Sequence, residues 1–254
     1  MATIDIIGGI FIDVYIFKDN EYYIHGSNIM IIPGGSGLNV AIGLSKLGHK
    51  VRIFGNIGND FMGEYCLKIL SEYAVDTNWI QKLNYPTPTF ITINEKPLAV
   101  SRKAADIDIL LSKNKADYLF ITTEVNSNIV NSSIFMNYKK TFFDIGPRPK
   151  IITKKYENVI YIGNEKECEI FSFNCDIVKL GLNGVRWGDI KLEGNKKEAP
   201  YKIGMGDVFD IFLIDGILNN KEKEIILKSA MNKSESVMKE LGALNKIIKF
   251  SKSH

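Results

Sequence analysis

Thiols and imidazoles are scarce in this chain of 254 residues, which has only three cysteines and three histidines. No two cysteines are separated by just two residues, and the three histidines lie far apart in the sequence. These spacings exclude the usual zinc patterns and give no Cys/His pair for nucleophilic catalysis. We therefore expect Cys66, Cys168 and Cys175 to be unpaired thiols in a reducing compartment.

The chain also lacks a dominant charge and a long apolar run. Its formal net charge is +3, and Lys and Arg are interspersed with Asp and Glu, so nucleic-acid binding has little electrostatic support. No apolar stretch is long enough to cross a bilayer without polar interruption, and the N-terminus does not read as a signal peptide. We expect a cytoplasmic protein with neither a nucleic-acid nor a membrane partner.

Arginine is rare, with four of the 32 basic residues. Its planar guanidinium suits two-point recognition of phosphate or carboxylate, so each arginine is either a surface ion-pair partner or an anion contact. Arg148, in a turn, and Arg102, near a hairpin-like segment, are the better candidates for an anion contact. The other two are Arg52 and Arg186.

The most informative segment that is present is Gly204-Met205-Gly206-Asp207, which precedes an almost uninterrupted apolar run at 208–218. Apolar residues on nearly every face predict a buried helix that begins at the glycines. Helix N-termini bind anions through unpartnered N–H groups, and Asp207 would stand beside such a site as a proton acceptor. The segment predicts phosphoryl transfer to an alcohol; the simpler alternative is a glycine turn capped by an aspartate.

A second glycine-rich loop runs from Pro33 through Gly34, Gly35 and Gly37 to Asn39 and opens an amphipathic helix. It is not a Walker A loop, because no Gly-Lys-Ser/Thr follows, and its spacing does not fit a dinucleotide fingerprint. Asn39 is a poor helix former in a first turn, where its amide could face a polar ligand.

Short β-rich runs alternate with helical stretches along the chain, without a repeat or linker that divides it. This predicts one α/β domain over 1–254, with a mainly parallel sheet and ligands at the carboxyl ends of its strands. Two segments, 14–32 and 87–105, alternate polar and apolar residues instead and predict a separate small sheet. Expected strands are 4–8, 51–55, 118–122, 141–144, 159–162 and 177–180; expected helices are 38–47, 63–73, 128–137, 166–171, 208–218 and 222–241.

Together the two glycine segments resemble the signatures of the ribokinase-like, or PfkB, family of carbohydrate kinases. The first signature matches at Gly34, Gly35, Gly37 and Asn39, and continues through Gly55, Gly58, Asp60 and Gly63. The second matches from Gly204 to Asp207, with Met205 in place of alanine.

The resemblance implies a three-layer αβα sandwich with a small β-sheet lid, and transfer of the γ-phosphoryl group of ATP to a sugar hydroxyl. Asp207 would be the general base, and the backbone N–H groups of Gly204, Met205 and Gly206 would form the anion hole. We expect the helix N-terminus to lower the pKa of Asp207. The lid would also pair two copies of the chain into a homodimer.

The resemblance extends to further site residues. For the acceptor these are Asp13, Gly34, Gly35, Asn39, Glu124 and Arg102; for the nucleotide, Lys179, Gly181, Gly184 and Asn232; for phosphate and Mg²⁺, Asn164, Glu167 and Arg148. No residue is expected to be a direct metal ligand, because Mg²⁺ on nucleotide phosphates is held mainly through water.

Four positions depart from the family pattern: Gly146, Tyr201, Lys202 and Phe212. Lys202 either contacts a phosphate or is merely exposed. Two alternative functions stay open, a nucleoside kinase of the same fold and a catalytically weak sugar- or nucleotide-binding sensor.

Overall fold

The computed structural model describes residues 1–18, 24–113 and 116–250. Within them, one sheet has nine strands in the order β13-β12-β11-β10-β9-β8-β1-β4-β5. The pairs from β5 to β11 are parallel, and the β12–β13 hairpin adds two antiparallel strands at one edge. The strands are β1 (Thr3–Ile7), β4 (Lys50–Gly58), β5 (Asp76–Leu83), β8 (Tyr118–Thr122), β9 (Lys140–Asp144), β10 (Val159–Asn164), β11 (Ile177–Lys179), β12 (Val185–Trp187) and β13 (Ile190–Leu192).

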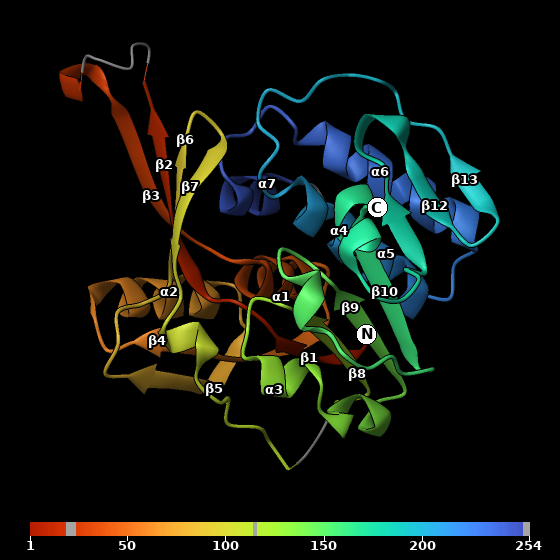
Figure 1. Ribbon diagram of the computed structural model, residues 1–254, viewed down its shortest axis with the longest axis horizontal. Helices are drawn as coiled ribbons and strands as arrows, with labels where there is room; N and C mark the ends of the chain where they lie inside the picture. The colour runs from red at the N-terminus through yellow and green to blue at the C-terminus, as the bar shows by residue number, and fades with distance from the viewer. Residues whose placement is uncertain (19–23, 114–115, 251–254) are drawn as a thin grey trace.

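Helices cover both faces of this sheet (Figure 1). Consecutive strand residues are apolar and point to opposite faces, so Phe142 joins one core cluster and Phe143 the other. One cluster also contains residues of α1, α2, α5, α6 and α7, and the other those of α3 and α4 or their flanks. The helices are α1 (Ser36–Lys46), α2 (Phe61–Glu72), α3 (Ser127–Val130), α4 (Glu165–Ile170), α5 (Met205–Leu218), α6 (Lys223–Ser236) and α7 (Ala243–Lys249).

A second, four-stranded sheet has the order β3-β2-β6-β7 and projects from the body of the molecule (Figure 1). Its strands are β2 (Phe11–Phe17), β3 (Asn28–Gly34), β6 (Thr89–Ile93) and β7 (Lys96–Ser101). The predicted small sheet is thus confirmed, although 19–23 of the predicted segment 14–32 lie outside the described residues. The α/β class with a mainly parallel sheet is confirmed as well.

The structure corrects two expectations from the sequence. Cys168 and Cys175 form a disulfide, because the loop after α4 brings their Cα atoms to 5.9 Å, and Cys66 alone is a buried free thiol. The expected helix 128–137 is instead α3 followed by a 3₁₀ turn, η3 (Ser133–Asn137). Between them, the side chain of Asn131 bonds the backbone at Ile151 and Thr153, which competes with helical hydrogen bonding.

The described residues include no helix with the length and apolar character needed to span a bilayer.

Candidate active site

The Gly204 turn opens helix α5, as the sequence predicts. Gly204 has φ 85°, a left-handed conformation that favours glycine, and a Cβ there would stand 2.4 Å from the Cα of Ala243. The N–H of Met205 donates to the carbonyl of Lys202 at 3.2 Å. The following N–H groups, of Gly206 and Asp207, lie in the first helical turn, where a helix has no internal acceptors.

Asp207 lies in this first turn and is nine-tenths buried. Its Oδ2 accepts a hydrogen bond of 2.7 Å from the amide of Asn39 on α1. Burial and the nearby Asp144 carboxylate raise the pKa of Asp207, whereas hydrogen bonds from Asn39 and Ser36 and the charge of Lys179 act to lower it. The expectation of a lowered pKa is therefore wrong, because desolvation of the carboxylate outweighs these hydrogen bonds and the nearby positive charge.

Two further carboxylates lie close enough to Asp207 for its charge to raise their pKa values. Asp13, in β2, accepts a hydrogen bond from the Tyr15 hydroxyl at 3.1 Å, and burial raises its pKa to about 7. Glu124, after β8, accepts the N–H of Ser36 at 2.8 Å, and burial and Asp207 raise its pKa to about 8. The structure thus brings Asp13, Asn39, Glu124 and Asp207 together from four separate elements.

The first glycine loop packs directly against the end of β1 and this carboxylate group. Gly35 has φ 86°, and a Cβ there would stand 2.6 Å from the carbonyl oxygen of Gly9. A Cβ on Gly34 would stand 2.2 Å from Oδ2 of Asp13. Only glycines allow α1 to begin this close to the acidic side chains.

The two arginines with a predicted anion-binding role are both engaged by the protein itself. Arg102 pairs with Asp106 at 2.9 Å and donates to the carbonyl of Glu124 at 3.1 Å. Arg148 donates to the carbonyls of Thr123, at 2.9 Å, and Val125. Both therefore brace the segment that carries Glu124, and their roles toward acceptor or phosphate stay predictions.

A buried ion cluster adjoins Gly206. The ammonium group of Lys179, at the end of β11, lies 3.1 Å from Oδ2 of Asp210 and 3.4 Å from Oδ2 of Asp144. It also lies 3.5 Å from where a Cβ would stand on Gly206. Asp210 is fully buried, and burial raises its pKa well above the usual range; the two carboxylates in turn raise the pKa of Lys179.

A cavity of about 550 Å³ connects this cluster with the glycine turn and α6. Its wall contains four lysines and three acidic residues, Asp144, Glu167 and Glu235, and this small excess of positive charge suits an anionic ligand. The wall includes five residues predicted to bind the nucleotide or its phosphates: Lys179, Gly181, Gly184, Asn164 and Glu167. It also includes Lys196, Lys197, Lys202, Met205 and Gly206.

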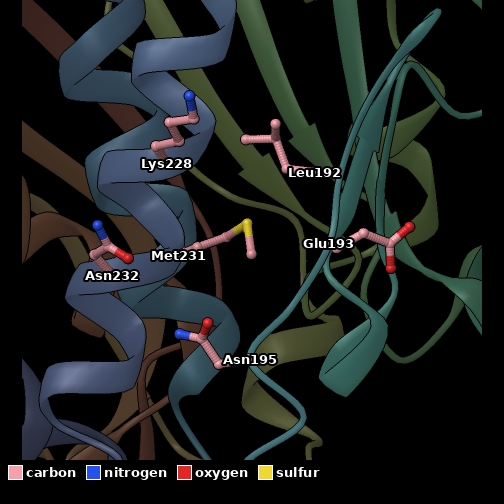
Figure 2. A pocket seen from close by; sticks show the side chains of 6 residues that line it. All are labelled: Leu192, Glu193, Asn195, Lys228, Met231 and Asn232. Atoms are coloured by element: carbon pink, nitrogen blue, oxygen red, sulfur yellow. The ribbon is translucent and has the colours of Figure 1, made fainter.

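Asn232 lies in a neighbouring pocket of about 270 Å³ between the end of β13 and α6. Figure 2 shows Met231 pointing from α6 towards Leu192 and Glu193, with Asn195 at one end of the pocket. Asn195 and Met231 line both spaces, so the pocket continues the larger cavity.

The residues predicted for Mg²⁺ satisfy each other. Asn164 and Glu167 form a capping box at the start of α4, in which each side chain accepts a backbone N–H of the other residue. Among the described residues, no three His, Cys, Asp or Glu side chains gather as a metal site. The protein groups alone do not fit a direct Mg²⁺ site, and no chemical step is assigned to the metal here.

The sequence predictions missed three residues of this region: Ser36, Asp144 and Asp210. Asp210 had a recognisable signal, because it is a charged residue inside the apolar run that predicts α5. Ser36 lies within the first glycine loop and Asp144 is the last residue of β9, positions that many structural residues also occupy.

Residues 1–123 match the family model described as pfkB family carbohydrate kinase. A sugar kinase of Pyrococcus horikoshii is 30% identical over 127 residues, which span 50% of this chain and 39% of that protein. A 5-dehydro-2-deoxygluconokinase of Lacticaseibacillus casei is 32% identical over 179 residues, 70% of this chain and 52% of that protein. The matched segments thus span less than two thirds of these relatives' own lengths.

The similarity of fold extends over nearly the whole chain. The structure of Arabidopsis thaliana ribokinase with ribose and ATP superimposes with a TM-score of 0.77 at 16% identity, covering 98% of this chain and 99% of that chain. The residues that the family model matches include the first glycine loop, whereas the Gly204 turn and Asp207 lie outside them. The first half of the chain thus matches the pfkB family of carbohydrate kinases, and the chain as a whole has a ribokinase-like fold.

Proposed function

We propose that this protein transfers the γ-phosphoryl group of ATP to a hydroxyl of a small sugar or sugar derivative. The observation that carries the proposal is the placement of Asp207. It is buried at the N-terminus of α5, held by Asn39, and adjoins a cavity with lysines on its wall. A proton acceptor and an anion-binding site on one helix end are what phosphoryl transfer to an alcohol needs.

In this proposal each part of the site has one role. Asp207 takes the proton of the acceptor hydroxyl, and the backbone N–H groups of Gly206 and Asp207 bind the transferring phosphoryl oxygens, because the N–H of Met205 already donates to Lys202. Asp13 and Glu124 accept hydrogen bonds from other acceptor hydroxyls, or donate them when protonated. The 550 Å³ cavity and its continuation at Asn232 hold the phosphates and base of the nucleotide.

ATP is the proposed donor, supported by the similarity in fold to a ribokinase solved with ribose and ATP. For the acceptor, the carboxylates and the amide of Asn39 fit a polyol better than a flat apolar group. Nothing in the described site favours a nucleoside base over a sugar, so nucleosides serve as one arm of the test.

The test supplies magnesium-ATP and a panel of neutral sugars, sugar acids, sugar phosphates and nucleosides, with ADP release and product mass as readouts. We expect ADP release that one or more sugars stimulate and that Asp207→Asn lowers by roughly 10²–10⁴-fold. Stimulation by nucleosides alone would identify a nucleoside kinase. Nucleotide binding without stimulation by any acceptor would identify a sensor and overturn the proposal.

We also propose a homodimer formed through the small sheet. One face of this sheet carries a patch of apolar side chains from three neighbouring strands. On β2 these are Val14 and Ile16, which pair with Ile31 and Ile29 of β3 on one side and with Ile91 and Ile93 of β6 on the other. Ile29 and Ile31 are 62% and 43% exposed. An apolar sheet face of this kind is typical of an interaction surface, and a second copy presents the same face.

A further inference from the structure

We propose that Lys179 is a catalytic residue whose ammonium group contacts the transferring phosphoryl group, and that Asp210 is the positioning residue that holds it there. The inference deepens the proposed function and rests on it for the catalytic step. Asp210 has no assigned role in that function.

The position of Lys179 carries the first part of the inference. Its Nζ stands 3.5 Å from the Cβ position of Gly206, in the turn proposed to bind phosphoryl oxygens. Lys179 and Gly206 line the same cavity. A phosphoryl group bound at the N–H groups of this turn would therefore lie within contact distance of the ammonium group, which is an effective stabiliser of phosphoryl oxygens.

The surroundings of Lys179 carry the second part. A buried lysine is costly unless it is paired, and this one faces two carboxylates, Asp210 and Asp144. Asp210 contacts it with both oxygens, at 3.1 and 3.3 Å, and is itself fully buried. Asp144 is shared, since its other oxygen accepts the N–H of Gly146 at 3.0 Å.

Asp210 and Asp207 are three residues apart on α5, so they lie on one side of the helix about one turn from each other. The helix that places the proposed base therefore also places the anchor of Lys179. Lys179 also lines the 550 Å³ cavity beside the proposed base, which a purely structural ion pair would not need to do. The arrangement fixes the distance between the proton acceptor and the cation.

The proposed step transfers the γ-phosphoryl group of ATP to the acceptor hydroxyl. The oxygen of the acceptor hydroxyl forms a bond to the γ-phosphorus of ATP, while the bond from that phosphorus to the β–γ bridging oxygen breaks. The electron pair of the broken bond stays on ADP, and the hydroxyl proton passes to Asp207. Lys179 keeps its proton throughout. Its ammonium group contacts an oxygen of the phosphoryl group and stabilises the negative charge on that oxygen during the transfer.

The first experiment measures binding rather than turnover. Calorimetry compares ATP and ADP binding to wild type, Lys179→Met and Lys179→Met/Asp210→Asn. We expect both variants to lose on the order of 10-fold or more in ATP affinity and little in ADP affinity, because only ATP carries the γ-phosphate. The double variant removes both charges and so guards against a misfolded single variant.

The second experiment measures catalysis. Lys179→Ala should lower kcat by roughly 10²-fold, the usual effect of removing one group that stabilises a transition state, and added methylammonium or ethylammonium should restore part of it. Asp210→Asn should lower kcat less than Lys179→Ala and shift KM little. Lys139→Met, which breaks an exposed pair with Asp117, is the matched control and should change neither property.

The two experiments separate the failure of this inference from that of the proposed function. If Lys179→Met lost its preference for ATP over ADP but wild type turned over no acceptor, the contact between Lys179 and the γ-phosphate would be supported. The proposed kinase function would then be wrong. Full turnover with unchanged ATP preference in the double variant would leave Lys179 a structural residue and overturn the inference. Absence of nucleotide binding to wild type would overturn both.

Discussion

Asp207 shows at the scale of one residue how two requirements conflict. Burial raises its pKa, yet a general base must be ionised to accept a proton. The hydrogen bond from Asn39 and the positive charge of Lys179 both act in the opposite direction. The surrounding side chains therefore determine at which pH the residue can act.

Replacing Asp207 by Asn should lower kcat by roughly 10²–10⁴-fold, because the amide keeps the size but cannot accept the proton. ATP affinity should stay within a few-fold of wild type. Steady-state kinetics and calorimetry check both statements. A variant with more than about a third of the wild-type rate would rule out Asp207 as the base.

Asn39, predicted to bind the acceptor, donates its amide to Asp207 instead, and its own Oδ1 is buried without a protein partner. An acceptor hydroxyl could still donate to that oxygen. Asn39→Ala removes a bond that favours the ionised form, so it should raise the pKa of Asp207. We expect the acidic limb of the kcat–pH profile to move to higher pH, and an unmoved limb would contradict this.

At the scale of elements, the small sheet is hydrogen-bonded to the residues that precede the Gly204 turn. Glu95 lies in the β6–β7 turn, with φ 62°, and its Oε2 accepts the N–H groups of Lys202 at 2.8 Å and Ile203 at 3.1 Å. Phe17 of β2 meets Tyr201 edge to face, with ring centroids 6.2 Å apart. The tip of the sheet thus contacts the residues just before Gly204.

Glu95→Ala should loosen this connection, since two charge-assisted hydrogen bonds are lost. We expect a higher KM for the acceptor and faster hydrogen exchange at 94–96 and 201–204, with folding of the main sheet preserved. Exchange mass spectrometry with and without acceptor provides the measurement. Glu72→Ala, an exposed acid at the end of α2, is the control, and equal exchange in the two variants would refute the connection.

Elements with strong local patterns were predicted well. The buried runs that form β1, β4, β8, β9 and β10 contain near-continuous apolar residues, and α1 and α5 begin at glycine turns. By contrast, β5 and the β12–β13 hairpin were not predicted. In β5 the residues are half-buried or exposed along its length, so its identity depends on pairing with β4.

At the scale of the whole molecule, the buried carboxylates link stability to pH. Asp13 and Glu124 have pKa values of about 7 and about 8, both raised mainly by burial. The folded protein therefore holds protons that the unfolded chain releases near pH 4. The free energy of unfolding should fall as pH rises from about 4 to about 8.

Urea unfolding at pH 5 and pH 8 measures this dependence. The double variant Asp13→Asn/Glu124→Gln cannot release these protons, so its stability should change less between the two pH values than that of wild type. An equal change in both proteins would show that these carboxylates do not govern the dependence.

The proposed homodimer is also a property of the whole molecule. Light scattering of wild type should exceed the monomer mass of 28.6 kDa at tens of micromolar. Ile29→Lys/Ile31→Lys should return it to monomer mass, because burying two charges on an apolar sheet face is costly. A monomeric wild type would show that the proposal is wrong. A double variant that is still dimeric would show that the dimer forms through a different surface.

Local interactions explain why three features could be predicted from the sequence alone: the α/β class, the two glycine turns, and helix α5, which begins at the turn that carries Asp207. Backbone conformation at glycine and burial of apolar runs are properties of short segments. The predicted gathering of ligands at the carboxyl ends of strands fits Glu124, just after β8, and Asn164, at the end of β10, whereas Asp13 lies within β2 of the small sheet.

Other features depend on segments that are distant in the sequence. The engagement of Arg148 by the carbonyls of Thr123 and Val125 needs the neighbouring strands β8 and β9 to lie side by side. The direction of the Asp207 pKa shift is likewise a balance of burial against groups on other elements. The shift is therefore determined only in the folded protein, because burial of a carboxylate and its distance from other charges are not fixed in an unfolded segment.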